Sequence, residues 1–211
     1  MIKTYHTHQD YFFEGYEIAA SNSDFSTLTR IEIKDDIELQ SILGFGTAMT
    51  DSACYVLHKA DSSLREEIFK RLFSKEGLDL NIVRLSVAAS DYSKDCFSYN
   101  DKVDDVEMNN FSLEHDHEYV VPVLQEVAGS KPNIYFVSST WNPPGWMKTG
   151  GQMAGGWLRE KYVEAYAEYY FHFIKSYAAQ GIKLSALTPR TKLRPIRYQE
   201  YRHACCIPNS K

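Results

Sequence analysis

Three polar segments of this 211-residue chain each follow a short apolar run, and each contains residue types that could bind a polar substrate. They span residues 44–51, 88–93 and 138–149. Together they contain two carboxylates and two indoles: Asp51, Asp91, Trp141 and Trp146. Carboxylates accept hydrogen bonds from sugar hydroxyl groups, and an indole face packs on the C–H face of a pyranose ring. If the segments meet at one place, this combination suits a carbohydrate better than a phosphate or a nucleotide.

The elements predicted around these segments alternate between strands and helices. Strands are predicted at residues 11–13, 27–33, 38–46, 80–87, 133–138 and 183–188. Helices are predicted at residues 51–60, 62–74, 118–127 and 161–179, and Gly181 is placed to end the last one. Short apolar strands between helices indicate a parallel α/β sheet or barrel, whose carboxyl edge would collect the three polar segments. About four strand–helix units are present.

Composition and charge restrict the class of protein. Hydrophobic residues make up 44% of the chain and charged residues 24%, as in an ordinary globular protein. The net charge of -5 argues against a nucleic-acid partner. There is no apolar leader at the amino terminus and no stretch long enough to span a membrane. The four cysteines lack metal-ligand spacing, so we expect no metal, reduced thiols and a cytoplasmic protein.

Five motifs follow one another in an order and spacing that resemble glycoside hydrolase family 30 of the glucosylceramidase type. They are GFGTAMTDSA, NIVRLSVAASDYS, NNFSL, SSTWNPPGWMKTGG and ALTP. The resemblance covers about residues 25–190 and corresponds to the N-terminal half of such an enzyme. It implies a partial (β/α)8 TIM barrel over residues 38–190, preceded by N-terminal strands of a β side domain in residues 1–37.

The resemblance also implies a function and a set of site residues. The family consists of retaining β-glycosidases that hydrolyse β-glucosides such as glucosylceramide, so the expected partner is a carbohydrate or glycolipid, and no cofactor is expected. Asp51 and Trp141 match the residues that bind the sugar at the cleaved position. Arg84 and Asp91 lie at matching strand ends and would support the site, and Trp146 would form part of the cleft wall.

The catalytic carboxylates themselves are not found. The family's acid/base is the Glu of an Asn-Glu pair after the fourth strand, where this chain has Thr191 and Lys192. A lysine, with an ordinary pKa of about 10.4, cannot take over the role of that acid. The nucleophile belongs to a later strand that this sequence does not reach. We therefore expect a truncated, inactive relative without catalytic residues.

The last 21 residues have a different character from the rest. Residues 191–211 carry a net charge of +4, so the first 190 residues carry -9. Read in a frame shifted by one nucleotide, the codons after Pro189 can spell Asn-Glu, which is the pair that the family has. The hypothesis is that residues 191–211 are an out-of-frame tail. A basic arm that binds nucleic acid is the alternative.

Each of these assignments has a plainer alternative. Asp51 could cap the helix that it begins, and Asp91 could be a turn residue. Trp141 and Trp146 could be core packing, and Arg84 could be a structural ion-pair partner. The pairs His6/His8 and His115/His117 could bind a metal only with a third ligand. At the level of the whole chain, the alternatives are a non-catalytic carbohydrate-binding protein and an enzyme completed by a partner chain.

Overall fold

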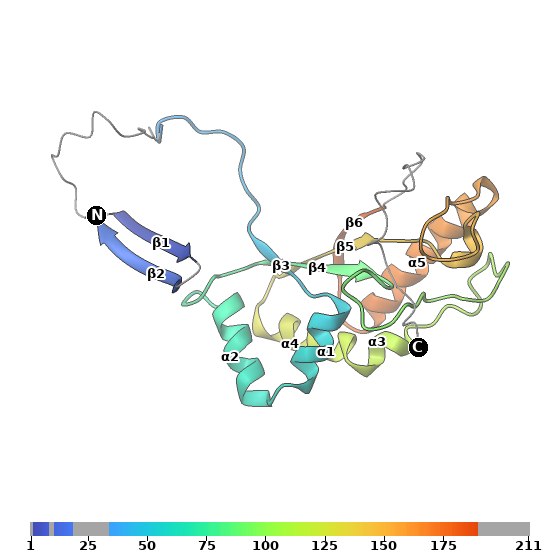
Figure 1. Cartoon of the computed structure of the whole chain (residues 1–211), viewed down its shortest axis with the longest axis horizontal. Helices are drawn as coiled ribbons and strands as arrows, with labels where there is room; N and C mark the ends of the chain where they lie inside the picture. The colour runs from blue at the N-terminus through green and yellow to red at the C-terminus, as the bar shows by residue number, and fades with distance from the viewer. Residues whose placement is uncertain (1, 9–10, 19–33, 190–211) are drawn as a thin grey trace. The chain divides into compact units, whose positions relative to one another are not determined.

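The computed structural model describes the backbone of residues 2–8, 11–18 and 34–189, and the side chains of residues 34–189 (Figure 1). It forms two compact units, Met1–Ile42 and Leu43–Lys211. The domain boundaries given by the sequence, at residues 37 and 190, stay predictions. The predicted tail, with Thr191 and Lys192, lies outside the described residues.

The first unit contains a two-stranded antiparallel sheet. Its strands are β1 (Ile2–His8) and β2 (Tyr11–Ile18), with Tyr5 opposite Gly15. The strand predicted at residues 11–13 is confirmed as part of β2. The strand predicted at residues 27–33 lies outside the described residues.

The second unit contains a four-stranded parallel sheet with the order β3-β4-β5-β6. Its strands are β3 (Gly46–Ala48), β4 (Ile82–Val87), β5 (Tyr135–Thr140) and β6 (Leu184–Thr188). Its helices are α1 (Asp51–Lys59), α2 (Ser62–Phe73), α3 (Glu114–Glu118), α4 (Val120–Ser130) and α5 (Val163–Ala179), with short 3-10 turns at Gly145–Met147 and Glu160–Tyr162. The predicted parallel α/β sheet is confirmed.

The register of the sheet sets residues from different strands side by side. Ala48 pairs with Arg84, Arg84 with Val137, and Val137 with Ala186, which makes one row across all four strands. One step nearer the carboxyl edge, a second row contains Ser86, Ser139 and Thr188. Because side chains alternate along a strand, the two rows lie on the same face of the sheet. This face is called the open face below.

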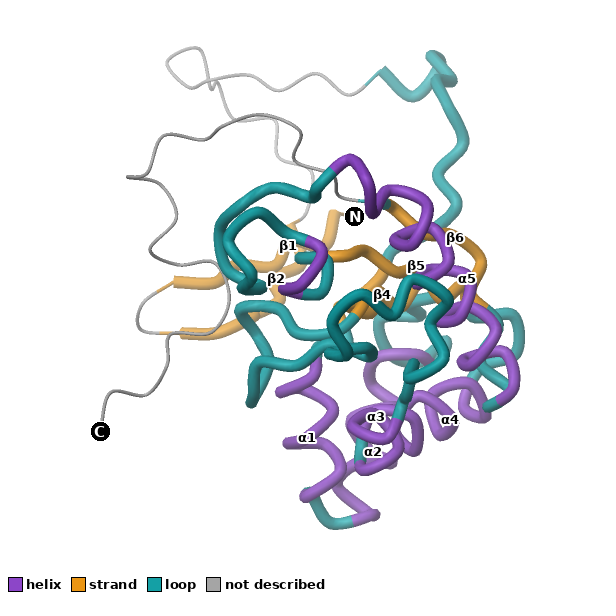
Figure 2. The backbone as a smooth tube through the Cα atoms, turned by 90° about the vertical axis from the view of Figure 1, so that its right-hand side faces the viewer, coloured by secondary structure: helices purple, strands orange, loops and turns teal. Residues whose placement is uncertain are grey.

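The opposite face of the sheet is covered by the helices (Figures 1 and 2). It is formed by side chains of β4 and β5 that are almost fully buried, namely Val83, Leu85, Val87 and Phe136. They pack in one core with buried residues of α4 and α5, including Leu124 and Phe173. Each such Val or Leu contributes about 1.5–3 kcal/mol when removed from water. The helix-covered face therefore holds the sheet together, and the open face is left for other contacts.

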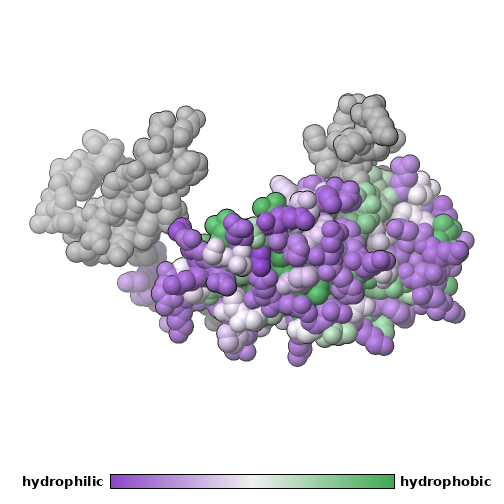
Figure 3. All heavy atoms as spheres, turned by 90° about the horizontal axis from the view of Figure 1, so that it is seen from below, coloured by the Kyte–Doolittle hydropathy of each residue, from purple (hydrophilic) through white to green (hydrophobic). Residues whose placement is uncertain are grey.

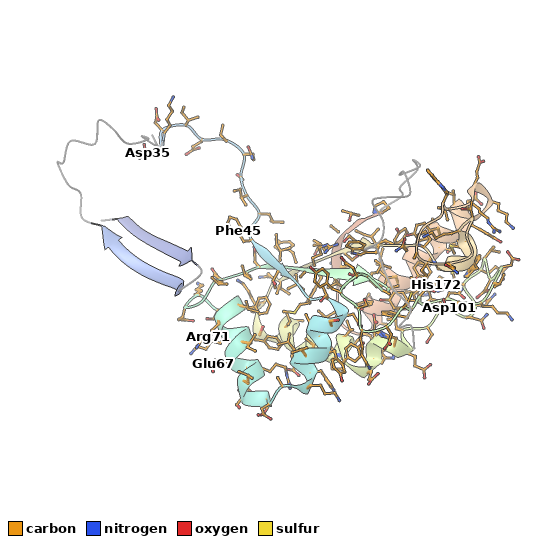
Figure 4. All side chains as sticks on the ribbon, in the orientation of Figure 1. Asp35, Phe45, Glu67, Arg71, Asp101 and His172 are labelled. Carbon is orange, nitrogen blue, oxygen red and sulfur yellow. The ribbon has the colours of Figure 1, made fainter. Side chains whose placement is uncertain are left out.

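The outer sides of the helices are mainly polar, with exposed apolar side chains such as Val56, Leu64 and Phe171 among them. Seen from below, this unit presents a mostly hydrophilic surface with isolated hydrophobic residues (Figure 3). On α2, Arg71 and Glu67 form an exposed ion pair of 2.6 Å one turn apart (Figure 4). A pair of this kind contributes only about 0.3–0.5 kcal/mol, so burial on the inner side dominates the stability of the helix.

The end of α5 follows the sequence prediction closely. Gly181 has a φ of 79°, a left-handed conformation that glycine adopts without strain. The N–H of Gly181 donates to the carbonyl of Ala178, and the N–H of Ile182 donates to the carbonyl of Tyr177, both at 3.0 Å. These two bonds make a Schellman motif, which turns the chain toward β6.

Two element predictions need correction. Residues 38–45 are irregular instead of forming a strand, and β3 is confined to Gly46–Ala48. Leu39 is 83% exposed and Phe45, labelled in Figure 4, is 71% exposed, so their apolar pattern is not used for pairing. The helix predicted at residues 118–127 is α4, which begins at Val120; the short helix α3 before it was not predicted, and Tyr119, with φ at -150°, separates the two.

No helix in the described part of the chain is long and apolar enough to cross a membrane.

Candidate functional site

A cavity of about 480 Å³ lies on the open face toward the carboxyl edge of the sheet. It is lined by residues of the two rows and their neighbours: Arg84, Val137, Ser138, Ser139, Thr140, Ala186, Thr188 and Pro189. The polar side chains of the two rows that line it are Arg84, Ser139 and Thr188, and they lie among the apolar side chains of Val137, Ala186 and Pro189. Such a lining can exchange hydrogen bonds with a polar ligand.

Arg84 is the charged residue of this cavity. It projects from the middle of β4, and its Nε donates to Ser139 Oγ on β5 at 2.8 Å. The predicted structural role was an ion pair, and Arg84 forms none within residues 34–189. Because an arginine has five N–H donors and one is used here, the guanidinium group keeps donors for a ligand.

Asp51 lies at the carboxyl end of β3, where α1 begins. Its side chain is only 4% exposed, yet both oxygens have donors. Oδ2 accepts from the Lys94 backbone N–H at 2.7 Å, and Oδ1 accepts from the Tyr119 hydroxyl at 2.8 Å. The capping alternative is wrong, because Thr50 is the N-cap and its Oγ1 accepts from the Ala53 N–H at 3.2 Å.

Around Asp51 lies a group of polar residues, buried except for the half-buried His115, whose association the sequence did not reveal. We call it the carboxylate cluster; it consists of Asp51, Tyr99, His115, Asp116, Tyr119 and Tyr177. Asp116, which is 1% exposed, accepts hydrogen bonds from the hydroxyls of Tyr99, at 2.7 Å, and Tyr177. His115 stands between the two carboxylates. The i, i+3, i+7 spacing of Leu113, Asp116 and Val120 was the available sequence signal for Asp116, although Tyr119 divides this stretch between α3 and α4.

The protonation of this cluster follows from burial. Burial raises the pKa of Tyr99 and of Tyr177 well above the ordinary value, and the charge of Asp116 adds to both effects. Burial also raises the pKa of Tyr119, together with its hydrogen bond to Asp51. The three hydroxyls therefore stay protonated at neutral pH and act as donors to the two carboxylates.

A second, much smaller cavity of about 10 Å³ lies inside the cluster. Asp51 and Asp116 both line it, with Ser86, Tyr99 and Tyr177 among their neighbours. This volume is about that of a single water molecule. The two carboxylates therefore cannot stand on either side of a glycosidic bond, although they are close in space.

Trp141 is half-buried and comes directly after β5. The strand ends at Thr140, and Trp141 stands in the bend that opens the following loop. The loop that follows is anchored by Lys148, a residue that sequence analysis did not select. The ammonium group of Lys148 is buried and donates to Asn142 Oδ1, at 3.1 Å, and to the carbonyl of Met153.

Trp146 and Asp91 have different surroundings. The Trp146 side chain is 8% exposed, its Nε1–H donates to the carbonyl of Asn100 at 2.9 Å, and its ring meets Tyr162 edge-on at 4.9 Å. This is the packing role that the sequence left open.

Asp91 is exposed in a turn of the loop after β4. That loop touches the start of α1, since Ser52 N–H donates to the Tyr92 carbonyl at 3.0 Å.

The predicted residues thus fall into two groups. The structure brings Asp51 together with the loop that carries Asp91, and it sets Arg84 in the cavity below the strand end that leads to Trp141. It places Trp146 against Tyr162 instead. Sugar binding by any of these five stays a prediction. No group of three or more metal-ligating side chains suited to an ion occurs among the residues that are described, and His115 and His117 do not share one.

Comparison with known proteins gives consistent matches. The glycosyl hydrolase family 30 TIM-barrel domain matches residues 42–203. A Caenorhabditis elegans protein named as a candidate glucosylceramidase is 35% identical over 163 residues, which are 75% of this chain and 31% of that protein. The endo-1,6-β-D-glucanase of Neurospora crassa is 30% identical over 156 residues, 71% of this chain and 32% of the other.

Solved structures agree with the sequence matches. SrfJ from Salmonella typhimurium superposes with a TM-score of 0.68 at 26% identity, covering 71% of this chain and 34% of that one. The endo-β1,6-glucanase BT3312 gives 0.66 at 29% identity, covering 74% and 36%. The chain spans about a third of the length of the relatives it matches. The chain therefore belongs to glycoside hydrolase family 30, and its parallel sheet is part of that family's (β/α)8 TIM barrel.

Proposed function

We propose that this chain carries the sugar-binding part of a retaining β-glycosidase, with Asp51 and Trp141 as the residues that contact the sugar. Arg84 and Asp91 support them from the neighbouring strand ends. Relatives named as glucosylceramidases and endo-1,6-β-D-glucanases support a glucosyl unit as the ligand. A β-glucoside such as glucosylceramide is the proposed substrate class of the complete barrel.

The observation that carries this proposal is the fixed carboxylate of Asp51 at the carboxyl end of β3. Active sites of TIM barrels lie at this end of the strands. A carboxylate has about four lone-pair positions, and two of those of Asp51 are used by Lys94 and Tyr119. The remaining positions are the ones that would accept a sugar hydroxyl group at the small part of Asp51, 6%, that is exposed, and the two existing bonds hold the carboxylate in place for it.

Hydrolysis needs more than these residues supply. A retaining mechanism requires two carboxyl groups about 5–5.5 Å apart on either side of the scissile bond. Asp51 and Asp116 enclose a cavity of only about 10 Å³, so they do not meet this requirement. Because Lys192 stands at the position of the family's acid/base, we propose that the chain with this sequence binds sugar without cleaving it. This is also the observation that favours the second candidate function, a non-catalytic carbohydrate-binding protein.

Asp51→Asn is expected to weaken the binding of methyl β-D-glucopyranoside by about 10- to 100-fold, because one hydrogen bond to a charged acceptor is lost. Ligand-observed NMR titration of the full chain measures the affinity. Asp61→Asn is the matched control, since Asp61 is exposed just before α2 and its side chain caps nothing. Equal affinity of Asp51→Asn and the wild type would contradict the assignment of Asp51.

The origin of the last 21 residues is tested separately by sequencing the gene across the codons for Pro189 to Thr191. We expect a one-base correction to restore an Asn-Glu pair and a long open frame. The protein translated from the corrected gene should then hydrolyse p-nitrophenyl β-D-glucopyranoside, whereas the 211-residue chain should not. The match to the family model extends to residue 203, which is the observation in favour of a genuine tail. Codons that cannot spell Asn-Glu in the shifted frame would rule the correction out.

A further inference from the structure

His115 lies between two buried carboxylates. Its Nδ1 is 3.1 Å from Asp116 Oδ1, and its Nε2 is 3.6 Å from Asp51 Oδ1. The same Nε2 is 3.2 Å from the Tyr119 hydroxyl oxygen. One face of the imidazole ring stacks on Phe97 with the ring centres 3.5 Å apart. The ring is therefore fixed in a position where both of its nitrogens face acceptors.

The surroundings of His115 are strongly acidic. The ionisable groups near it or near its two carboxylates are Asp51 and Cys54 on α1, Lys94, Asp95 and Tyr99 in the loop after β4, Asp116, Glu118 and Tyr119 in and after α3, and Tyr177 on α5. The cation of this set, Lys94, has its ammonium group over the Tyr55 ring at 4.9 Å and 3.9 Å from Asp95. His115 is thus the group placed to neutralise the carboxylate cluster.

The protonated form of His115 is favoured by this arrangement. Burial alone would lower the pKa of His115, but the hydrogen bond to Asp116 and the charges of Asp116, Asp51 and Asp95 outweigh it and raise the pKa. The side chain is 23% exposed, so the ring can exchange its proton with solvent. Its charge state therefore responds to pH although its partners are buried.

The single proton of the Tyr119 hydroxyl connects His115 to Asp51. When His115 is protonated, both nitrogens are donors, so Tyr119 gives its proton to Asp51 Oδ1 at 2.8 Å. When His115 loses a proton while Nδ1 still donates to Asp116, Nε2 becomes an acceptor that faces the Tyr119 hydroxyl. Nε2 then competes with Asp51 for that proton, and Asp51 loses part of its support.

We propose that His115 is a positioning residue for Asp51, which holds the carboxylate in its sugar-binding orientation while protonated and releases it when neutral. This inference rests on the proposed role of Asp51 in sugar binding. As the pH rises through the His115 titration, affinity for a β-glucoside falls by roughly 2- to 10-fold, the effect of one hydrogen bond. Sugar binding by this chain is then favoured in mildly acidic solution.

The first test follows the residues themselves, without sugar. In the full chain, the ring resonances of His115 should titrate with a midpoint above the ordinary 6.5. The Asp51 side-chain carboxyl carbon should shift with the same midpoint, and this shift should be absent in His115→Gln. His117→Gln is the matched control, because His117 is exposed on the same short helix two residues away. The proposal is overturned if the titration midpoint of His115 is at or below 6.5. It is also overturned if the chemical shift of the Asp51 carboxyl carbon does not change with the His115 midpoint.

The second test adds methyl β-D-glucopyranoside at several pH values. Wild type and His117→Gln should lose affinity over the His115 titration, whereas His115→Gln should bind equally at all of them. Affinity that does not follow the His115 midpoint overturns the positioning role. If no variant binds the sugar at any pH, the proposed function fails, and the coupling of His115 to Asp51 is decided by the carboxyl signal alone.

Discussion

Phe173→Ala is expected to destabilise the protein by about 3–5 kcal/mol, the usual loss when a large aromatic side chain is removed from a core. Phe173 has no exposed surface and packs against Tyr177 and Tyr99, with ring centres at 4.6 and 5.6 Å. The substitution leaves a cavity where α5 meets the helix-covered face of the sheet. Urea unfolding followed by circular dichroism measures the loss.

Phe171→Ala provides the matched control on the same helix. Phe171 is two residues earlier and 56% exposed, so its removal should cost less than about 1 kcal/mol. Both variants delete the same atoms and change helix propensity equally. Losses of similar size in the two variants would show that α5 does not pack as the structure has it.

Asp116→Asn is the second change for which we expect a large effect, a destabilisation of about 3–5 kcal/mol. The carboxylate accepts from Tyr99, Tyr177 and His115. An amide has one oxygen, so depending on its orientation an N–H group faces either the two buried tyrosine hydroxyls or protonated His115, and these donors lose their acceptor. The stability of Asp61→Asn, in which an exposed carboxylate is lost, should differ from wild type by no more than about 0.5 kcal/mol.

The effect of Asp116→Asn should depend on pH in a defined direction. The folded protein raises the pKa of His115, so the stability from this residue is fully present below its unfolded value and is lost as pH rises through the folded value. Asp116 provides the hydrogen bond behind this shift. The difference in unfolding free energy between wild type and Asp116→Asn should therefore shrink from pH 6 toward alkaline solution. A difference that grows instead would mean that His115 is neutral in the folded state.

The order of strands and helices in the second unit could be predicted because local sequence determines it. Residues 80–87 are a short, mainly apolar run, and the structure places β4 within them at Ile82–Val87. The helix predicted at residues 161–179 and its terminal Gly181 are confirmed by α5. In both segments the periodicity of apolar residues coincides with one buried face, so pattern and packing agree.

Predictions failed where a pattern had no partner or where contacts join distant segments. The alternation around Leu39 and Phe45 resembles a strand, but a strand needs a neighbour, and only Gly46–Ala48 pairs with β4. A Cβ on Gly46 would lie 2.3 Å from the Ile82 carbonyl oxygen, so this close pairing requires glycine. The pattern of apolar residues does not show this close backbone contact between β3 and β4.

The carboxylate cluster was missed for a related reason. His115 and His117 have the same spacing that could suggest a metal site, yet one is wedged between carboxylates and the other is exposed. The packing of α1, α3 and α5 against one another determines which of the two histidines is placed next to the carboxylates. Asp51 was found through its resemblance to the family motif, whereas its supporting residue Tyr119 lies 68 positions away and belongs to no motif that was recognised.

The rows of the open face restrict how this part of the barrel can change in evolution. Arg84 and Ser139 lie in neighbouring rows along the strand direction because β4 and β5 pair in register without a bulge. Deleting a single residue within β4 would turn Arg84 toward the helices and bring an apolar neighbour into the cavity. Substitution can therefore alter the chemistry in each row, while changes in length are confined to the connecting loops, such as residues 90–112 between β4 and α3.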